Sequence, residues 1–122
     1  MGLDMYVSKR RQPLPTPVDF NTRTTDEELF YWRKHPDLHG WFNSLYVYKG
    51  GTDPEFNCNT VEITTEDLDE LELDIKGDNL PSTSGFFFGV SCPEDKAEDL
   101  KFIELARQAI ADGYYLYYSS WW

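Results

Sequence analysis

The residues best suited to chemistry are concentrated in the stretch 31–42. It holds both histidines of the chain, two of its four tryptophans and the adjacent pair Arg33 and Lys34. A guanidinium can form two parallel hydrogen bonds to a phosphate, an imidazole titrates near neutral pH, and an indole or phenol offers a flat face to a base. We therefore expect a site for a small anionic ligand such as a nucleotide. The candidate ligand-binding residues are Tyr31, Trp32, Arg33, Lys34, His35, His39, Trp41 and Asn43.

Two other interpretations of the same residues stay open. Trp32, Trp41 and the histidines could be hydrogen-bonded core residues, as large aromatic side chains often are. Alternatively, His35 or His39 could act as a general acid and base beside Arg33 in a phosphodiesterase. The chain has no phosphate-binding loop, no GxGxxG and no GxSxG motif, so binding is favoured over catalysis and we assign no catalytic residue.

The spacing of the histidines and cysteines does not support a metal site. His35 and His39 have the i, i+4 spacing of a helical pair, but the residues between them lack the glutamate of HExxH. Cys58 and Cys92 stand far apart without a CxxC pair, which is typical of reduced thiols. We expect no metal and no cofactor.

Two short helices should position these residues. Thr24 and Thr25 precede acidic residues, which predicts a helix over 26–34, and Pro36 predicts a second helix over 37–48 that ends at Gly50. The residue before a proline is pushed out of the α region, so a break is expected at His35. The two helices would then gather the candidate residues into one corner.

The rest of the chain predicts a single α+β domain over residues 1–122. Apolar alternation or apolar runs predict strands over 2–8, 56–63, 85–90 and 114–122. N-cap and first-turn signals predict further helices that end at Gly77 and Gly113. We expect a small mixed or antiparallel sheet packed by about four helices.

Charge is distributed unevenly along this acidic chain. Residues 1–50 carry seven basic and six acidic side chains, whereas residues 51–122 carry four and sixteen, for a net charge of −11. This excess argues against direct binding to nucleic acid and allows a partner with a basic surface. No apolar run is long enough for a membrane span, and no export signal is visible, so a cytoplasmic protein is expected.

The helix expected to end at Gly77 carries most of the acidic density. In the simpler interpretation its carboxylates form a solvated helix face. In the alternative function they mimic the phosphates of a nucleic acid, and the protein inhibits a host defence or DNA-processing complex, as anti-CRISPR proteins do. The candidate partner-binding residues of this face are Glu66, Asp67, Asp69, Glu70, Glu72 and Asp74.

Four segments together resemble a family of small bacteriophage and prophage proteins without a settled biochemistry. They are the opening MGLDMY, the central YWRKHPDLHGW, the SGFFFG run and the closing YYSSWW, and the likeness covers nearly the whole chain. The resemblance implies a phage origin and a setting in the host cytoplasm. It transfers no catalytic residue. Together with the candidate site, it leads us to expect a phage accessory, anti-defence protein that binds a small anionic ligand.

Overall fold

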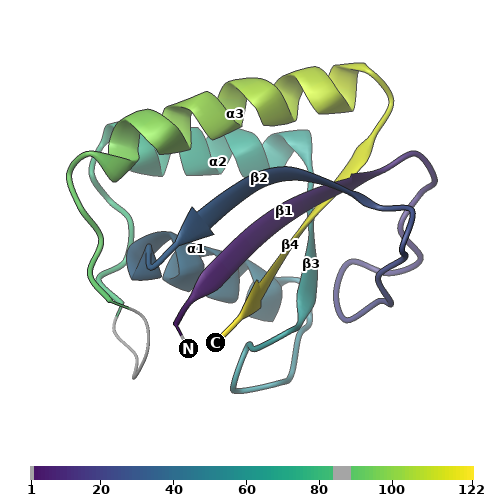
Figure 1. Ribbon diagram of the computed structural model, residues 1–122, viewed down its shortest axis with the longest axis horizontal. Helices are drawn as coiled ribbons and strands as arrows, with labels where there is room; N and C mark the ends of the chain where they lie inside the picture. The colour runs from purple at the N-terminus through teal and green to yellow at the C-terminus, as the bar shows by residue number, and fades with distance from the viewer. Residues whose placement is uncertain (1, 84–88) are drawn as a thin grey trace.

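A four-stranded antiparallel sheet and three helices make up the part of the chain described by the computed structural model, residues 2–83 and 89–122 (Figure 1). The strands are β1 (Asp4–Arg10), β2 (Glu27–Arg33), β3 (Thr60–Ile63) and β4 (Tyr115–Trp121), and their order in the sheet is β2-β1-β4-β3. The helices are α1 (Pro36–Tyr48), α2 (Thr65–Lys76) and α3 (Asp95–Ala111). The predicted α+β fold with a small antiparallel sheet is confirmed.

One face of the sheet, here called the inner face, forms the core with the helices. Strand residues alternate between faces, so Met5 and Val7 point inward and are completely buried, as their spacing predicted. Phe102 of α3 packs edge-on against Trp32, and Phe42 of α1 stacks on Tyr118 with ring centroids 4.1 Å apart. Helix α2 adds Leu68, Leu71 and Ile75 to the same core.

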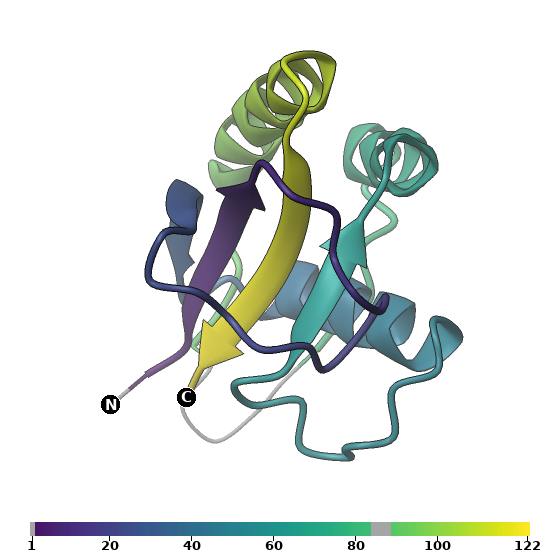
Figure 2. The same ribbon diagram turned by 90° about the vertical axis from the view of Figure 1, so that its right-hand side faces the viewer.

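The opposite face of the sheet, the outer face, is half covered by the chain between β1 and β2. Figure 2 shows this connection crossing in front of the strands, on the side opposite α1. Phe20 from this connection packs edge-on against Tyr117, and Arg10 and Asp26 lie buried beside them. The described residues leave the other end of the outer face uncovered.

The predicted helix over 26–34 is wrong, because this segment is strand β2. Its run Phe30, Tyr31, Trp32 has high strand propensity and alternates between the two faces. The acidic residue interpreted as a first-turn helix signal, Asp26, instead accepts hydrogen bonds from Arg10 and Tyr117. The described residues therefore contain three helices rather than four.

The other elements follow the sequence more closely. Helix α1 begins at Pro36, and α2 begins with a capping box in which Thr64 and Asp67 bond each other's backbone N–H groups. The strand predicted over 56–63 is shortened to β3. Of the strand predicted over 85–90, residues 85–88 lie outside the described part, and Gly89 and Val90 belong to no strand.

Candidate functional site

The uncovered end of the outer face carries a cluster of aromatic and charged side chains. In the strand register Tyr6 of β1 is paired with Tyr31 of β2, and Asp4 is paired with Arg33 on one side and with Trp121 of β4 on the other. Residues paired across antiparallel strands lie on the same face. We call these five residues, Asp4, Tyr6, Tyr31, Arg33 and Trp121, the aromatic platform.

The platform is open to solvent, unlike the core on the inner face. Tyr31 is 44% exposed and Trp121 is 68% exposed, and the Arg33 side chain is 53% exposed. The rings of Tyr6 and Tyr31 contact each other with centroids 5.3 Å apart. Because the inner-face aromatics already form the core, this second group is not needed to build it.

Asp4 holds the platform together electrostatically. The Tyr31 hydroxyl donates a hydrogen bond of 2.6 Å to Asp4 Oδ1, and Arg33 Nε lies 3.6 Å from the same oxygen. The hydrogen bond to the carboxylate raises the pKa of Tyr31 to about 12, and burial together with nearby Asp4 and Glu28 raises the pKa of Tyr6. Both phenols are therefore neutral at physiological pH.

Comparisons of the chain with protein-family models, curated proteins and solved structures gave no match. The resemblance to phage proteins therefore stays a prediction.

The platform offers two kinds of interaction to a ligand. Flat, exposed rings on a sheet surface can stack on a base, which contributes about 1–3 kcal/mol per base in known proteins. The guanidinium of Arg33 can turn from its long contact with Asp4 towards a phosphate and bind it through two hydrogen bonds. The arrangement suits a ligand with a planar ring and a negative charge.

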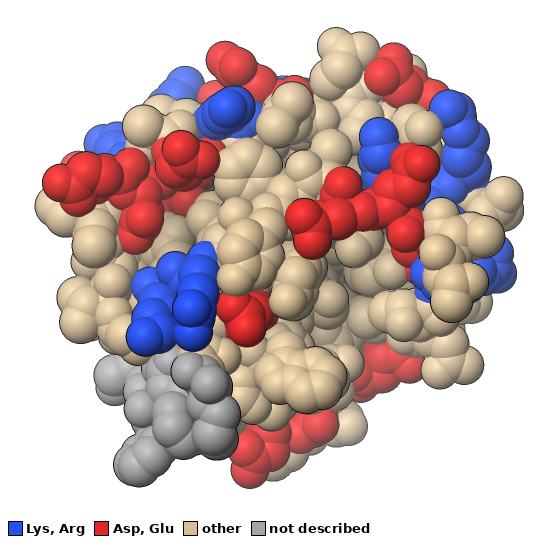
Figure 3. All heavy atoms as spheres, in the orientation of Figure 1, with Lys and Arg blue, Asp and Glu red and all other residues tan. Residues whose placement is uncertain are grey.

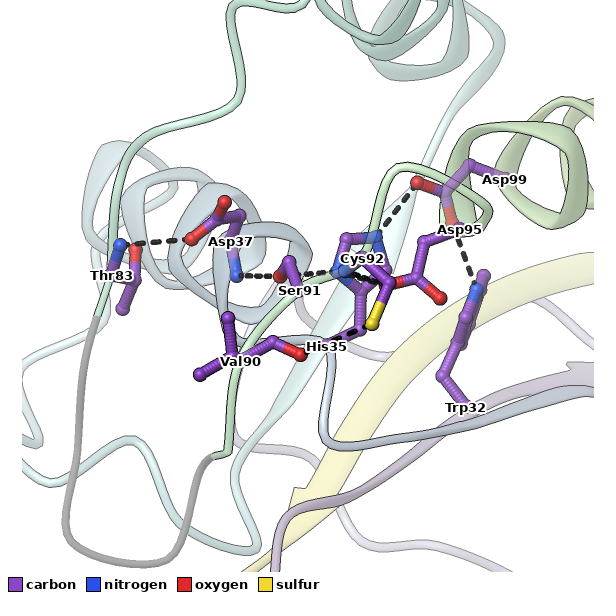
Figure 4. Close-up of polar contacts among 9 residues, drawn as sticks. All are labelled: Trp32, His35, Asp37, Thr83, Val90, Ser91, Cys92, Asp95 and Asp99. Carbon is purple, nitrogen blue, oxygen red and sulfur yellow. Dashed lines mark hydrogen bonds and ion pairs between the residues drawn. The ribbon is translucent and has the colours of Figure 1, made fainter.

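Trp32 and His35 lie away from the platform and belong to a buried polar network. His35 Nε2 lies 2.8 Å from Asp99 Oδ2, and Trp32 Nε1 donates to the other oxygen of Asp99 at 3.0 Å (Figure 4). On the other side of the ring, His35 Nδ1 lies 2.7 Å from Ser91 Oγ. We refer to Ser91, His35 and Asp99 as the His35 relay.

His39 is a core residue in this structure. It lies on α1 against Phe56 and Tyr118, and its Nδ1 is 2.6 Å from the Tyr118 hydroxyl. Burial lowers the pKa of His39 to about 4, so the ring is neutral at physiological pH. On α1, His39 and Tyr46 are therefore core residues, whereas Trp41 is half-buried.

The remaining candidates are dispersed over the surface. Trp41 donates its indole N–H to Asp74 of α2 at 2.8 Å, and Asn43 is half-buried on α1. Lys34 lies between β2 and α1 at φ 56°, exposed, beside Gly89. The structure thus brings Tyr31 and Arg33 together, with Lys34 beside Arg33 next to Gly2, and joins Trp32 and His35 through Asp99. His39, Trp41 and Asn43 lie apart from both pairs.

Most of the acidic residues on α2 are engaged within the protein. Asp67 binds Lys49, Asp74 binds Trp41, and Arg107 of α3 bridges Asp69 at 2.9 Å and Glu72 at 2.8 Å. On the one face drawn in Figure 3, from which α2 lies behind α3, carboxylates form separate groups among basic and uncharged residues. These ion pairs and hydrogen bonds give less support to a continuous phosphate-like stripe than the sequence did, although Glu66, Asp69 and Glu70 are exposed.

Several residues of both clusters were missed at the sequence level. Once residues 27–33 are known to form a strand, alternation places Tyr31 and Arg33 on one face with Asp4 and Tyr6. The spacing of these residues therefore indicates that they share a face. Ser91 and Asp99 carry no such signal, because their distance from His35 is set by the packing of α3. Within the described residues, no group of three His, Cys, Asp or Glu side chains is arranged to hold a metal ion, and no helix there is long and apolar enough to cross a membrane.

Proposed function

We propose that this protein binds a small anionic ligand with a planar ring, of the nucleotide class, on the aromatic platform. The observation that carries the proposal is the exposure of Tyr31, Trp121 and Arg33 on one uncovered end of the sheet. Aromatic rings on an antiparallel sheet are a known surface for stacking bases, because every base has a π-face. Arg33 supplies the charge that the phosphate needs.

The charge of the surroundings favours a small ligand over a long nucleic acid. The platform itself contains Asp4, Glu28 lies near its Tyr6, and the whole chain has a net charge of −11. A long phosphate backbone would meet this negative field along its length, whereas a nucleotide needs only one or two cationic contacts. Arg33 and the neighbouring exposed Lys34 can provide them.

The resemblance to phage proteins gives this binding a biological setting. In an infected cell, a small protein that holds a nucleotide would remove a signal on which a host defence depends. We propose this anti-defence role in the host cytoplasm as the context of the site. It depends on the predicted phage origin and is separate from the proposal that the platform binds a nucleotide.

The test is calorimetric titration of the protein with nucleoside mono-, di- and triphosphates and cyclic dinucleotides. We expect at least one of them to bind, and we expect Trp121→Ala to weaken that binding by about 1–3 kcal/mol through loss of stacking. Tyr48→Ala is the matched control, because Tyr48 is an aromatic residue that is 86% exposed on α1 and lies outside the platform. Failure of every nucleotide to bind, or an equal loss in Tyr48→Ala, would contradict the proposal.

A further inference from the structure

The His35 relay has the hydrogen-bond pattern of a catalytic triad that activates a serine. None of its residues belongs to the aromatic platform proposed to bind the nucleotide. An ionised carboxylate only accepts hydrogen bonds, so Asp99 fixes the imidazole proton on Nε2. Nδ1 is then the acceptor and faces the Ser91 hydroxyl at 2.7 Å. This matches the order of serine, histidine and aspartate in hydrolytic triads, with the two ring nitrogens exchanged.

Each member of the relay is held by a different element. His35 lies at the break between β2 and α1, Asp99 lies on α3, and both are almost completely buried. Ser91 comes from the segment that precedes α3, and its oxygen accepts the backbone N–H of Asp37 at 3.1 Å (Figure 4). Because that N–H belongs to the first turn of α1, it and the helix dipole stabilise negative charge on the serine oxygen.

The relay opens onto a cavity. A hollow of about 250 Å³ is lined by all three of its members and by residues at the starts of α1 and α3, including Asp37, Asp95 and Lys96. Ser91 is half-buried, whereas His35 and Asp99 are almost completely buried. A small substrate in the hollow would meet the serine first.

The charge of the cavity selects among substrates. Asp78 and Asp95 line it as well as Asp37, and its one lysine, Lys96, already contacts Asp78 at 3.2 Å. Asp95 also faces the imidazole, with its Oδ2 3.6 Å from His35 Nδ1. This negative field disfavours a phosphodiester, which argues against the phosphodiesterase interpretation of His35, and it favours an uncharged or cationic ester.

We propose that Ser91 is the nucleophile of an acyl-transfer site that cleaves small uncharged or cationic esters. Ser91 Oγ forms a bond to the ester carbonyl carbon while its proton passes to His35 Nδ1, and the ester C–O bond breaks as that proton moves to the leaving alcohol. Water then attacks the acyl-serine, gives its proton to His35 and releases the acid, with the proton returning to Ser91 Oγ. Asp99 is a positioning residue that holds the imidazole and stabilises its charged form.

The test uses the full chain, a fluorophosphonate probe and p-nitrophenyl acetate, with the adduct located by peptide mass spectrometry. We expect a single adduct on Ser91, slowed about 100-fold in His35→Gln and abolished in Ser91→Ala. Ser44→Ala is the control, because Ser44 is an exposed serine on α1 whose hydroxyl donates to the Gly40 carbonyl oxygen. Ester hydrolysis should fall in the same order.

A second readout separates positioning by Asp99 from a purely structural role. In Asp99→Asn the imidazolium loses its carboxylate partner, so the pH at which labelling is half-maximal should move to a lower value. No adduct on Ser91 in the wild type, or equal labelling in wild type and His35→Gln, would overturn the proposal. Nucleotide binding on the platform would stand in either case, because the two sites share no residue.

Discussion

The outer face of the sheet contains the same three residue types at both ends, in opposite environments. At the covered end, Arg10 holds Asp26 through two hydrogen bonds of 2.8 Å, and Tyr117 donates to the same carboxylate. At the uncovered end, Arg33, Asp4 and Tyr31 form the equivalent group, but the shortest ion-pair distance is 3.6 Å. The connection between β1 and β2, with Phe20, makes the difference.

This difference shows how burial decides what an arginine can do. The Arg10 side chain is 2% exposed, and its guanidinium binds both Asp26 and the Asn21 carbonyl oxygen, which holds the connection on the sheet. The Arg33 side chain is 53% exposed and loosely paired, so water already competes for it and a ligand can do so as well. The covered trio is structural, and we propose that the open trio binds the ligand.

The largest expected effect is on folding, at the covered end. Asp26→Asn leaves the buried Arg10 without its counter-ion, and breaking such a pair typically costs about 3–5 kcal/mol. Asp4→Asn, the matched change at the open end, should cost within about 1 kcal/mol. Urea denaturation of both variants measures the two losses, and equal losses would break the comparison.

The pH dependence of stability should also reflect the buried ion pair at the covered end. The hydrogen bonds from Arg10 hold the pKa of Asp26 well below its usual range, so the folded state binds this proton more weakly than the unfolded state. The stabilisation from Asp26 is therefore complete above the ordinary carboxyl pKa of about 4 and is lost as the pH falls below it. We expect the free energy of unfolding to fall between pH 4 and pH 2 more steeply in the wild type than in Asp26→Asn; parallel profiles would contradict this.

Ligand binding should depend on the open arginine. Arg33→Ala should weaken nucleotide binding by about 1.5–3 kcal/mol, the usual contribution of a charge-assisted hydrogen bond, while the melting temperature of the free protein stays unchanged. Calorimetry and thermal melts measure the two quantities. Arg23→Ala, at an exposed position on the connection, is the control. A lower melting temperature with unchanged nucleotide affinity would show that Arg33 stabilises the fold and does not bind the ligand.

The smallest effect is on the two tyrosines. Their pKa values are both raised to about 12, but the main cause is the hydrogen bond to Asp4 for Tyr31 and burial for Tyr117. Asp4→Asn should therefore move the pKa of Tyr31 back towards 10, whereas Asp26→Asn should leave most of the shift at Tyr117. Ring carbon shifts followed by NMR from pH 9 upwards measure both, and a Tyr31 pKa that ignores Asp4 would refute the assigned cause.

The sequence predicts the fold class well and the site only in part. Pro36, the Thr64 capping box and the alternation of Met5 and Val7 specify their elements through local interactions, so these predictions are confirmed. The predicted helix over 26–34 was wrong because an acidic residue after threonines can also form a buried ion pair. The partner of Asp26 in that pair, Arg10, is sixteen residues away in the sequence.

The histidines show the same limit at the site. His35 and His39 lie four residues apart, yet one contacts Ser91 and Asp99 and the other contacts Phe56 and Tyr118. These partners come from distant parts of the chain, and only the packing of α3 and β4 brings them near. Tyr31 and Arg33 could be named as candidates from the sequence because a phenol can stack and a guanidinium can bind an anion, whereas placing Tyr6 and Trp121 beside them required the strand register.

The most direct test of the platform uses the indole N–H resonances of the four tryptophans in an NMR titration with the nucleotide that binds most tightly. Trp121 lies on the platform, whereas the indole N–H groups of Trp32 and Trp41 are bound to Asp99 and Asp74. We predict a large shift for Trp121, with Trp32 and Trp41 unmoved. A titration that shifts Trp41 and leaves Trp121 in place would put the ligand elsewhere and contradict the account.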